Sequence, residues 1–327
     1  MRMIRSNEAY QEKKTYIKNL PDTLTLKKFV YHVAYPFLNI FYKLLIHTIK
    51  PKSNNGKYNI VFCTIFKNEA RFFKEWISYH NMIGVDHFYL YNNNSTDNYK
   101  EVLQPFVDKG IVTIIDWPQI PGQFTAYKHW YDNYRRDCNW CSFLDLDEFI
   151  CPKYDYNIKS WLKKFSKYPV IKIDWLMFGT STILEHDDNK PVIEQYTHCW
   201  NKKGRIGKEL YNCYYDIAYF NNTMHHVLSV KYKGIVIPPF NDSGNICINY
   251  TTQRYGSNSG SIQINHYYSR AYDILSQKLT KGDSAFIVGN KDSQPYWQRE
   301  MNCSSVDYTI QRFLLQLKIV LNNKEIL

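Results

Sequence analysis

The segment Trp140-Cys-Ser-Phe-Leu-Asp-Leu-Asp-Glu-Phe-Ile150 is the feature that most constrains this chain. Five largely apolar residues lead into Asp145, and Leu146 separates Asp145 from Asp147. A short apolar run that ends in acids is typical of a buried strand whose carboxyl end opens on a site. Because side chains alternate along a strand, both aspartates are expected to point the same way.

Two carboxylates placed so close together repel each other unless a cation lies between them or one of them is neutralised. Carboxylate oxygens are hard ligands that suit Mg²⁺ or Mn²⁺, and such an ion normally also binds a phosphate of the substrate. The pair therefore indicates a divalent metal site. The alternative for an isolated Asp-x-Asp is a strand that ends in a solvated acidic turn.

Strands and helices are predicted to alternate through the first half of the chain, which favours a parallel α/β sheet. Strands are expected at Tyr58–Ile65, Val85–Tyr91, Ile111–Ile115, Val170–Leu176 and Ile262–His266, in addition to the acidic strand. Helices are expected at Ala70–Ile83, Asn98–Lys109, Tyr127–Tyr134, Ile158–Tyr168 and Ser269–Lys281.

Three polar groups follow predicted strands directly. They are Thr64–Glu69, Asn92–Asp97 and Asp145–Glu148. Because the carboxyl ends of parallel strands meet at one edge of a sheet, functional groups collect there. The three groups are therefore predicted to form a single site, and this coincidence favours the metal site over the solvated turn.

Basic residues are concentrated at the start of the chain, which carries a net charge of +11 overall. Residues 1–57 contain eleven Lys or Arg and three acidic residues, so +8 of that charge lies there. The segment Phe29–Ile49 is apolar and aromatic, but polar residues and Pro36 interrupt it, and a membrane span needs about 20 mostly apolar residues. A basic, kinked, aromatic helix suits an anionic membrane surface; the alternative is a helix packed on the domain.

The remaining composition excludes some classes. The basic excess lies in the arm, which argues against nucleic-acid binding by the body of the chain. Of the 8 Cys, Cys138 and Cys141 form a single C-x-x-C. One such pair without a second pair or a His partner is a weak zinc or redox signal, so buried free thiols in a reducing cytoplasm are expected.

Seven segments, taken together, resemble one known family. They are Cys63-Thr-Ile-Phe-Lys-Asn-Glu69, Glu75-Trp-Ile-Ser-Tyr-His80, Gly84-Val-Asp-His-Phe-Tyr-Leu-Tyr-Asn92, Asn94-Ser-Thr-Asp97, Phe143-Leu-Asp-Leu-Asp-Glu-Phe149, Asp174-Trp-Leu-Met-Phe-Gly-Thr-Ser181 and His266-Tyr-Tyr-Ser-Arg270. They resemble a GT-A glycosyltransferase of the family 92 and family 2-like group. The resemblance does not cover the first 55 or the last 40 residues.

The resemblance implies an α/β fold of the GT-A type, with a mostly parallel, Rossmann-like central sheet flanked by helices and preceded by an N-terminal helical arm. We expect an arm and linker at residues 1–57, a glycosyltransferase domain at 58–290 and a C-terminal helical tail at 291–327. The implied activity is metal-dependent transfer of a sugar from a nucleotide sugar, expected to be a UDP-hexose, to a hydroxyl of a glycan or lipid-linked glycan, with inversion.

The metal site implied by the resemblance contains Asp147 as a ligand and Asp145 as a contact to the ribose or the metal. His266 matches a late histidine that can complete the metal shell. Imidazole suits Mn²⁺ better than Mg²⁺, so the cofactor is expected to be Mn²⁺ or Mg²⁺. For His266 the alternative is a core histidine on a strand.

The resemblance also implies a nucleoside site. Its residues would be Thr64, Asn68 and Glu69 after the first strand and Asn92, Asn93 and Asp97 in the turn after the second. That turn takes the place of an acidic base-binding turn, although Asn92 and Asn94 stand where Asp and Ser or Gly are common.

Arg270, Lys278 and Lys281 match a basic helix that could hold the diphosphate, with a solvated helix face as the alternative. In the family pattern the residue at the position of Arg270 is usually Lys, and the residue at the position of Lys281 is usually Arg. Inversion needs a carboxylate that deprotonates the acceptor hydroxyl. The candidates are Asp174 and Glu185, with Asp174 preferred.

Other classes stay open. A nucleotidyltransferase on a similar sheet would need a Gly-rich phosphate loop, and Thr64–Glu69 contains no Gly. A non-catalytic carbohydrate- or membrane-binding protein would have a decayed site, against which the intact Asp145/Asp147 pair argues. We expect a cytoplasmic enzyme, peripheral on the inner face of the cell membrane, with a nucleotide-sugar donor, a glycan or lipid-linked acceptor and no nucleic-acid partner.

Overall fold

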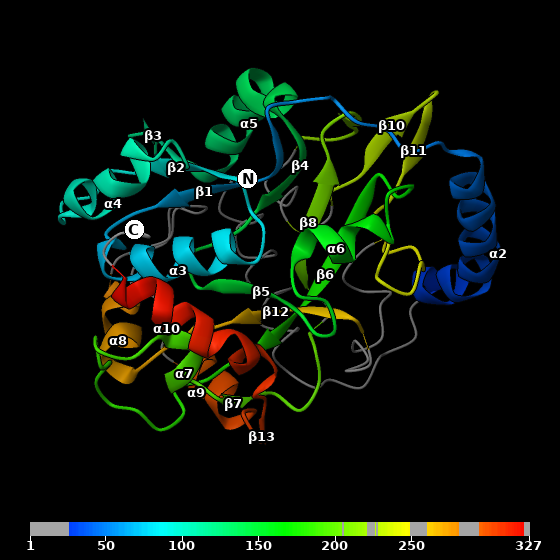
Figure 1. Cartoon of the computed structure of the whole chain (residues 1–327). Coiled ribbons are helices and arrows are strands. Elements are labelled where there is room, and N and C mark those ends of the chain that lie inside the picture. Colours follow the sequence, from blue (N-terminus) through cyan, green and yellow to red (C-terminus); the bar gives the residue numbers. More distant parts are fainter. Residues whose placement is uncertain are drawn as a thin grey trace.

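The chain is built around one eight-stranded sheet with the strand order β3-β2-β1-β4-β8-β6-β12-β5 (Figure 1). The structure is a computed structural model, and it describes residues 26–204, 206–220, 226, 228–248, 260–280 and 294–323. The strands of this sheet are β1 (Tyr58–Phe66), β2 (His87–Asn92), β3 (Val112–Asp116), β4 (Cys138–Phe143), β5 (Glu148–Pro152), β6 (Val170–Met177), β8 (Gly207–Asn212) and β12 (Ile262–His266).

Most strands of the sheet run in the same direction. β1 pairs in parallel with β2 and β4, β2 with β3, and β6 with β12. β8 is antiparallel to its neighbours β4 and β6, and β5 is antiparallel to β12. The carboxyl ends of β1, β2, β3, β4, β6 and β12 therefore share one edge, and the predicted α/β class with a mostly parallel sheet is confirmed.

The acidic segment contains the end of one strand, the connection that follows it and the start of a second strand. β4 ends at Phe143 and β5 begins at Glu148, so Asp145 and Asp147 lie in the connection between them. β5 pairs with β12 at the far edge of the sheet, and the chain must turn away from β4 to reach it. The prediction that strand alternation aligns the two carboxylates is therefore wrong.

β1 is apolar along most of its length because both faces of the sheet are covered. Its alternate residues enter different core clusters, with Ile60, Phe62 and Phe66 in one and Val61, Cys63 and Ile65 in the other. The first cluster includes residues of α3 (Ala70–Met82), α4 (Tyr99–Asp108), α6 (Ile158–Lys163), α8 (Tyr272–Thr280) and α10 (Leu314–Asn322). The second includes residues of α5 (Gln123–Tyr134) and the end of α2 (Leu26–Thr48).

Short elements complete the described chain. They are α7 (Val192–Gln195), α9 (Gln294–Met301), the 3₁₀ turns Arg135–Asp137 and Thr309–Phe313, the sheet of β9 (Asp216–Ile217), β10 (Val230–Tyr232) and β11 (Ile235–Ile237), and the pair of β7 (His198–Cys199) and β13 (Ser305–Val306). All eight Cys are free thiols and seven of them are buried, which confirms that part of the cysteine prediction.

Both ends of the described chain pack against the sheet domain. α10 lies beside α3 (Figure 1), where Leu317 is fully buried and the Lys74 ammonium donates to the Leu321 carbonyl oxygen at 3.0 Å. α2 lies at the periphery beside β10 and β11 (Figure 1), and the Tyr42 hydroxyl donates to the Val236 carbonyl oxygen of β11 at 2.8 Å. Among the residues that the structure describes, no helix is long and apolar enough to cross a membrane.

We expect Gly207→Ala to destabilise the fold strongly. Gly207 of β8 pairs with Asp174 of β6, and a Cβ at this position would lie 1.9 Å from the Ile173 carbonyl oxygen. Since neither strand can move away without breaking the sheet, the loss in unfolding free energy should be about 3 kcal/mol or more. Thermal or urea unfolding of the purified variant measures it.

Gly110→Ala is the matched control. Gly110 also needs a special backbone, with φ at +71°, but no atom lies within 4 Å of its added Cβ. It should cost only about 1–2 kcal/mol of left-handed strain. Equal losses in the two variants would show that the contact between β6 and β8 at Gly207 is not as close as described.

Candidate active site at the carboxyl edge of the sheet

The connection between β4 and β5 is fixed through its backbone. Each carbonyl oxygen from Leu144 to Asp147 accepts a hydrogen bond, three of them from distant parts of the chain and one from within the turn. The donors are the Thr64 hydroxyl to Leu144 (2.7 Å), the Glu148 N–H to Asp145 (3.1 Å), the Arg270 guanidinium to Leu146 (2.8 Å) and the Tyr267 N–H to Asp147 (2.8 Å). The turn that carries the acids is thus held by β1 and by the segment that follows β12.

Asp147, Glu148 and His266 form a compact group of candidate metal ligands. Their ligand atoms all lie within 4.8 Å of one another, and Nε2 of His266 lies 3.4 Å from Oδ1 of Asp147. Nδ1 of His266 and Oε1 of Glu148 are buried and have no hydrogen-bond partner among the described residues, although buried polar atoms are normally satisfied. Two carboxylates and an imidazole with unused buried ligand atoms fit a divalent ion such as Mn²⁺.

Two lysines oppose the acidic group. The fully buried Lys208 of β8 places its ammonium 2.9 Å from Oδ2 of Asp145 and 3.7 Å from Oε2 of Glu148. Lys278 of α8 forms an ion pair with Asp147. Burial alone would raise the pKa of Asp147, but Lys278 and His266 hold that pKa well below its usual range.

Glu148 differs from the other two carboxylates because it is completely buried. Burial raises the pKa of its carboxyl group well above the usual range, and Lys208 offsets only part of that effect. The structure thus brings Asp147 and His266 together, as the metal assignment requires, and adds Glu148, which the sequence analysis had not assigned as a ligand. Asp145 is directed to Lys208 instead.

Arg270, assigned to the diphosphate, is a buried residue rather than part of a solvated helix face. It precedes α8 with a φ of +52°, and its guanidinium lies 3.5 Å from the centre of the Phe72 ring. One terminal nitrogen donates to the Leu146 carbonyl oxygen and the other contacts Glu69 at 3.2 Å. Arg270 therefore ties the end of β1 to the acidic turn.

Lys278 lies on the described part of α8, beside the Tyr268 ring at 4.0 Å, and it contacts Asp147 rather than pointing away into solvent. Lys281, the third residue assigned to the diphosphate, lies outside the described residues.

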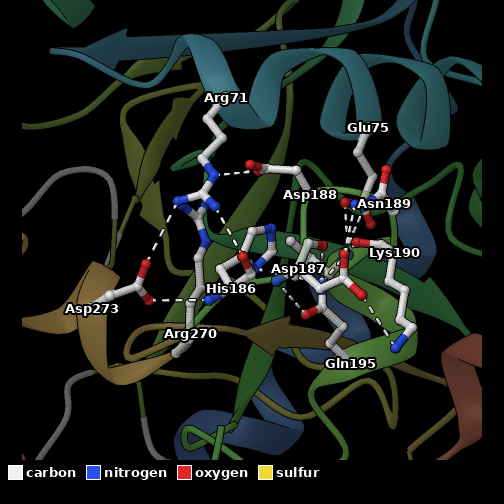
Figure 2. A network of polar contacts seen from close by, with 12 residues as sticks. Arg71, Glu75, His186, Asp187, Asp188, Asn189, Lys190, Gln195, Arg270 and Asp273 are labelled. Carbon is white, nitrogen blue, oxygen red and sulfur yellow. Dashed lines mark hydrogen bonds and ion pairs between the residues drawn. The ribbon is translucent and has the colours of Figure 1, made fainter. Parts of the chain in front are cut away.

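A polar network supports the start of α8 (Figure 2). Arg71 of α3 forms an ion pair with Asp188 and donates to the His186 carbonyl oxygen at 3.0 Å, and it lies 3.7 Å from Asp273 of α8. The His186 N–H also contacts Asp273 at 3.2 Å. The loop after β6 is therefore joined to α3 and α8 next to Arg270.

The residues assigned to the nucleoside lie together at the ends of β1 and β2. Asn68 has a φ of +53°, and its side-chain oxygen accepts the Thr96 N–H at 2.7 Å. Asp97 accepts the Ala70 N–H at 2.8 Å, which satisfies one of the free donors in the first turn of α3. The two polar segments are thus in direct contact.

The asparagines after β2 support the connection that follows β3. The Asn92 amide donates to Asp116 at 2.9 Å, and the Asn93 amide donates to the carbonyl oxygens of Trp117 and Gln119 at 2.8 Å. Both asparagines are buried, as is Thr64. These side chains shape the edge of the sheet, whereas Asn68 and Glu69 are partly exposed there.

The two candidate bases lie in different environments. Asp174 is inside β6, since the strand continues to Met177, and its carboxylate forms an ion pair with the buried Lys172. Alternation along β6 places Asp174 on the opposite face from Trp175, whose ring centre lies 4.4 Å from that of His266. Glu185 is exposed in the loop after β6.

The sequence analysis placed Glu148 in the site without assigning it as a ligand, and it missed Lys208. Glu148 directly follows Asp147, and its position at the start of a buried strand was the signal that could have identified it. Lys208 had no such signal, because only the antiparallel pairing of β8 with β4 and β6 brings it to the acidic turn.

The fold and the site define a class: an α/β domain with a metal-competent acidic turn and opposing cations at the carboxyl edge of its sheet. Residues 58–297, more than half of the chain, match the family model "Glycosyltransferase family 92". The chain belongs to glycosyltransferase family 92, as its sequence segments indicated.

Curated relatives carry the same family name. A glycosyltransferase family 92 protein of Ricinus communis is 25% identical over 261 residues, which cover 76% of this chain and 41% of that protein. One of Oryza sativa subsp. japonica is 35% identical over 115 residues, 35% of this chain and 20% of that protein. Galactan beta-1,4-galactosyltransferase GALS2 of Arabidopsis thaliana is 26% identical over 144 residues, covering 40% of this chain and 28% of that protein. The chain thus spans less than half the length of these relatives.

Solved structures resemble the chain only distantly. TarS 1-349 of S. aureus in complex with UDP has a TM-score of 0.30 and 11% identity, over 36% of each chain. TarS 1-349 alone has a TM-score of 0.32 and 12% identity, over 47% of each chain. TM-scores below 0.5 support no argument about the function of this chain.

We expect Lys208→Met to destabilise the protein by about 3 kcal/mol. The substitution keeps the length of the side chain but leaves Asp145 and Glu148 facing each other without the buried ammonium, and breaking a buried ion pair has a cost of this size. Chemical unfolding of wild type and variant, in the absence of divalent ions, gives the difference.

Lys164→Met provides the control, because Lys164 pairs with Asp155 at 2.7 Å but is largely exposed. An exposed pair contributes within about 1 kcal/mol. If Lys208→Met costs no more than Lys164→Met, Lys208 does not neutralise the acidic turn.

Proposed function

We propose that this chain is a metal-dependent glycosyltransferase. It transfers a sugar from a nucleotide sugar, a UDP-hexose, to a hydroxyl of a glycan or lipid-linked glycan, with inversion. The observation that carries the proposal is the group of Asp147, Glu148 and His266 at the carboxyl edge of the sheet, opposed by lysines, in a chain that belongs to a glycosyltransferase family.

Asp147, Glu148 and His266 would hold Mn²⁺ or Mg²⁺, with Asp145 as a further carboxylate beside them. A divalent ion bound there supplies Lewis-acid stabilisation for the diphosphate that leaves the sugar. Lys278 and Arg270, together with Lys281 from the sequence assignment, would add positive charge on the side of α8 where negative charge develops.

The nucleoside would bind over the ends of β1 and β2. Asn68 and Glu69 are partly exposed there, and the turn from Asn92 to Asp97 forms the adjoining wall. Thr64, Asn92 and Asn93 would support this site without touching the nucleoside. Their side chains are buried, and each donates a hydrogen bond that holds a neighbouring turn or loop.

The names of several relatives suggest which substrates to test first. Three of them are named galactan beta-1,4-galactosyltransferases of Arabidopsis thaliana. UDP-galactose and short β-1,4-linked galacto-oligosaccharides are therefore the first donor and acceptor to try, followed by other UDP-hexoses.

A lipid-linked acceptor would place the enzyme at a membrane surface. We propose peripheral attachment to the cytoplasmic face of the cell membrane, supported by the charge of +8 in residues 1–57. Each basic residue near an anionic surface contributes about 1 kcal/mol of attraction.

We expect Asp147→Asn to remove the Mn²⁺-dependent part of UDP binding and to reduce hydrolysis of the donor at least tenfold. The carboxylate is the central member of the ligand group, and a tenfold loss corresponds to roughly 1.4 kcal/mol of barrier. Calorimetric titration of UDP with and without Mn²⁺ measures the binding, and UDP release from UDP-hexoses measures the reaction. Asp145→Asn should weaken both to a smaller extent.

Asp132→Asn is the control for this experiment, since Asp132 is an exposed carboxylate paired with a lysine on α5. It should behave like wild type. If Asp147→Asn still binds UDP in a Mn²⁺-dependent way and keeps more than about a tenth of the activity, the ligand assignment is wrong. If wild type binds no UDP with Mn²⁺ present, the transferase proposal fails.

The base can be assigned by comparing Asp174→Asn with Glu185→Gln. General base catalysis contributes about 10²–10⁴-fold, so the variant that removes the base should lower kcat by at least about a hundredfold while UDP binding stays unchanged. The other variant should change kcat by less than about threefold. A large loss confined to Asp174→Asn would assign the base to Asp174, and one confined to Glu185→Gln would assign it to Glu185.

Melting temperatures are needed for both variants, because Asp174→Asn leaves the buried Lys172 without its carboxylate. Loss of kcat together with normal melting and normal UDP binding supports a catalytic role. Loss of folding with Asp174→Asn is tested further with Asp174→Glu, which should restore the ion pair but not the position of the base.

A further inference from the structure

α2 presents a continuous apolar surface to solvent. Val33, Phe37, Ile40, Phe41 and Leu44 are all at least half exposed, and Phe37 reaches 72%. With 3.6 residues per turn, these five positions fall within an arc of about 100° on one side of the helix. The face extends about 17 Å along the helix axis from Val33 to Leu44, at a rise of about 1.5 Å per residue.

The opposite side of α2 is bound to the domain. Tyr35 donates to the Ile246 carbonyl oxygen at 2.9 Å, and Asn39 exchanges two hydrogen bonds with the segment at Asn245. Tyr42 reaches β11, and Ile46 and Ile49 are buried in the second core cluster. These residues lie on the side of α2 that faces the domain, which we call its inner face. The exposed apolar side, formed by Val33, Phe37, Ile40, Phe41 and Leu44, is called the outer face of α2.

Of the two alternatives considered for this segment, packing on the domain describes its inner face. The inner face packs on the domain, so the helix does not need a membrane to be ordered. Within the described chain the apolar side chains of the outer face stay at least half exposed, although large apolar side chains at helical spacing normally pack against an apolar partner.

The charge around the helix indicates the partner. Between Leu26 and Lys57 the sequence contains six lysines and no acidic residue, and residues 1–57 carry +8. An anionic lipid surface complements that charge and also offers an apolar layer to Phe, Ile and Leu. A second copy of this chain would bring an equally basic arm against the first, which disfavours self-association through this face.

We propose that the outer face of α2 inserts into the interface of an anionic phospholipid bilayer, with the helix axis parallel to the membrane. The inference deepens the membrane attachment proposed above and rests on that proposal for its biological purpose. Since the inner face fixes α2 to β11 and to the loop at Asn245, membrane binding would hold the whole domain in one orientation rather than tether it loosely.

The test compares two double variants of the full chain. Phe37→Ser with Phe41→Ser removes two residues of the outer face that are 72% and 50% exposed. Leu315→Ser with Ile319→Ser is the matched control, because these residues of α10 have the same spacing and are 74% and 55% exposed. Binding to phosphatidylcholine vesicles, with and without phosphatidylserine, is measured by co-sedimentation at low and high salt.

Wild type and the α10 variant should bind the phosphatidylserine vesicles equally. The α2 variant should lose at least about tenfold in partition coefficient, because two aromatic rings no longer enter the bilayer. High salt should weaken binding of wild type without abolishing it, since the apolar contribution is not screened.

Equal binding of the α2 variant and wild type, or equal losses in both double variants, would overturn the proposal. So would a wild-type dimer in light scattering that Phe37→Ser with Phe41→Ser converts to a monomer without changing vesicle binding. Mn²⁺-dependent UDP binding is measured on the same preparations. Loss of vesicle binding with normal UDP binding concerns this surface alone, whereas absent UDP binding in wild type concerns the proposed transferase.

Discussion

The site depends on the opposition between three carboxylates in one short turn and the cations that distant segments bring to them. Asp145, Asp147 and Glu148 lie within the five residues that follow β4, where their mutual repulsion would destabilise any structure that left them uncompensated. Lys208 arrives from β8 and Lys278 from α8, each in contact with a different aspartate. The antiparallel insertion of β8 between β4 and β6 is what places a buried ammonium at the carboxyl edge of an otherwise parallel sheet.

The backbone of that turn is as strongly held as its charges. Four successive carbonyl oxygens accept hydrogen bonds, and the donors include Thr64 and Arg270 from segments far apart in the sequence. Arg270 also contacts Glu69 and stacks on Phe72, so the acidic turn, the end of β1 and the start of α8 form one unit. A candidate ligand group fixed in this way needs little rearrangement to bind an ion. This favours binding, because the conformational entropy of these side chains and of the turn is already lost when the protein folds.

The alternation of strands and helices made the parallel sheet predictable from the sequence, and the position of polar groups after β1, β2 and β4 made its functional edge predictable. Local patterns failed where long-range pairing decides the structure. The apolar run before Asp145 was predicted as a strand that ends at the acids, but no local pattern showed that the chain then turns and that Glu148–Pro152 pairs with β12 as β5. Lys208 carried no signal in the sequence, and Arg270 was assigned to the diphosphate rather than to a buried contact with the acidic turn. Their burial arises from contacts with segments that no local pattern identifies.

Charge balance links the proposed ion to the proposed donor. Asp145 and Asp147 are each offset by a lysine, and burial raises the pKa of Glu148 well above its usual range. A divalent ion added to this arrangement leaves the site with excess positive charge, which a diphosphate group would compensate. If the ligand assignment is correct, ion and donor should therefore bind with positive coupling, and each should tighten the other by the same factor. Lys278 has a direct part in this coupling. When an ion binds Asp147 in place of Lys278, the Lys278 ammonium becomes available to the diphosphate oxygens.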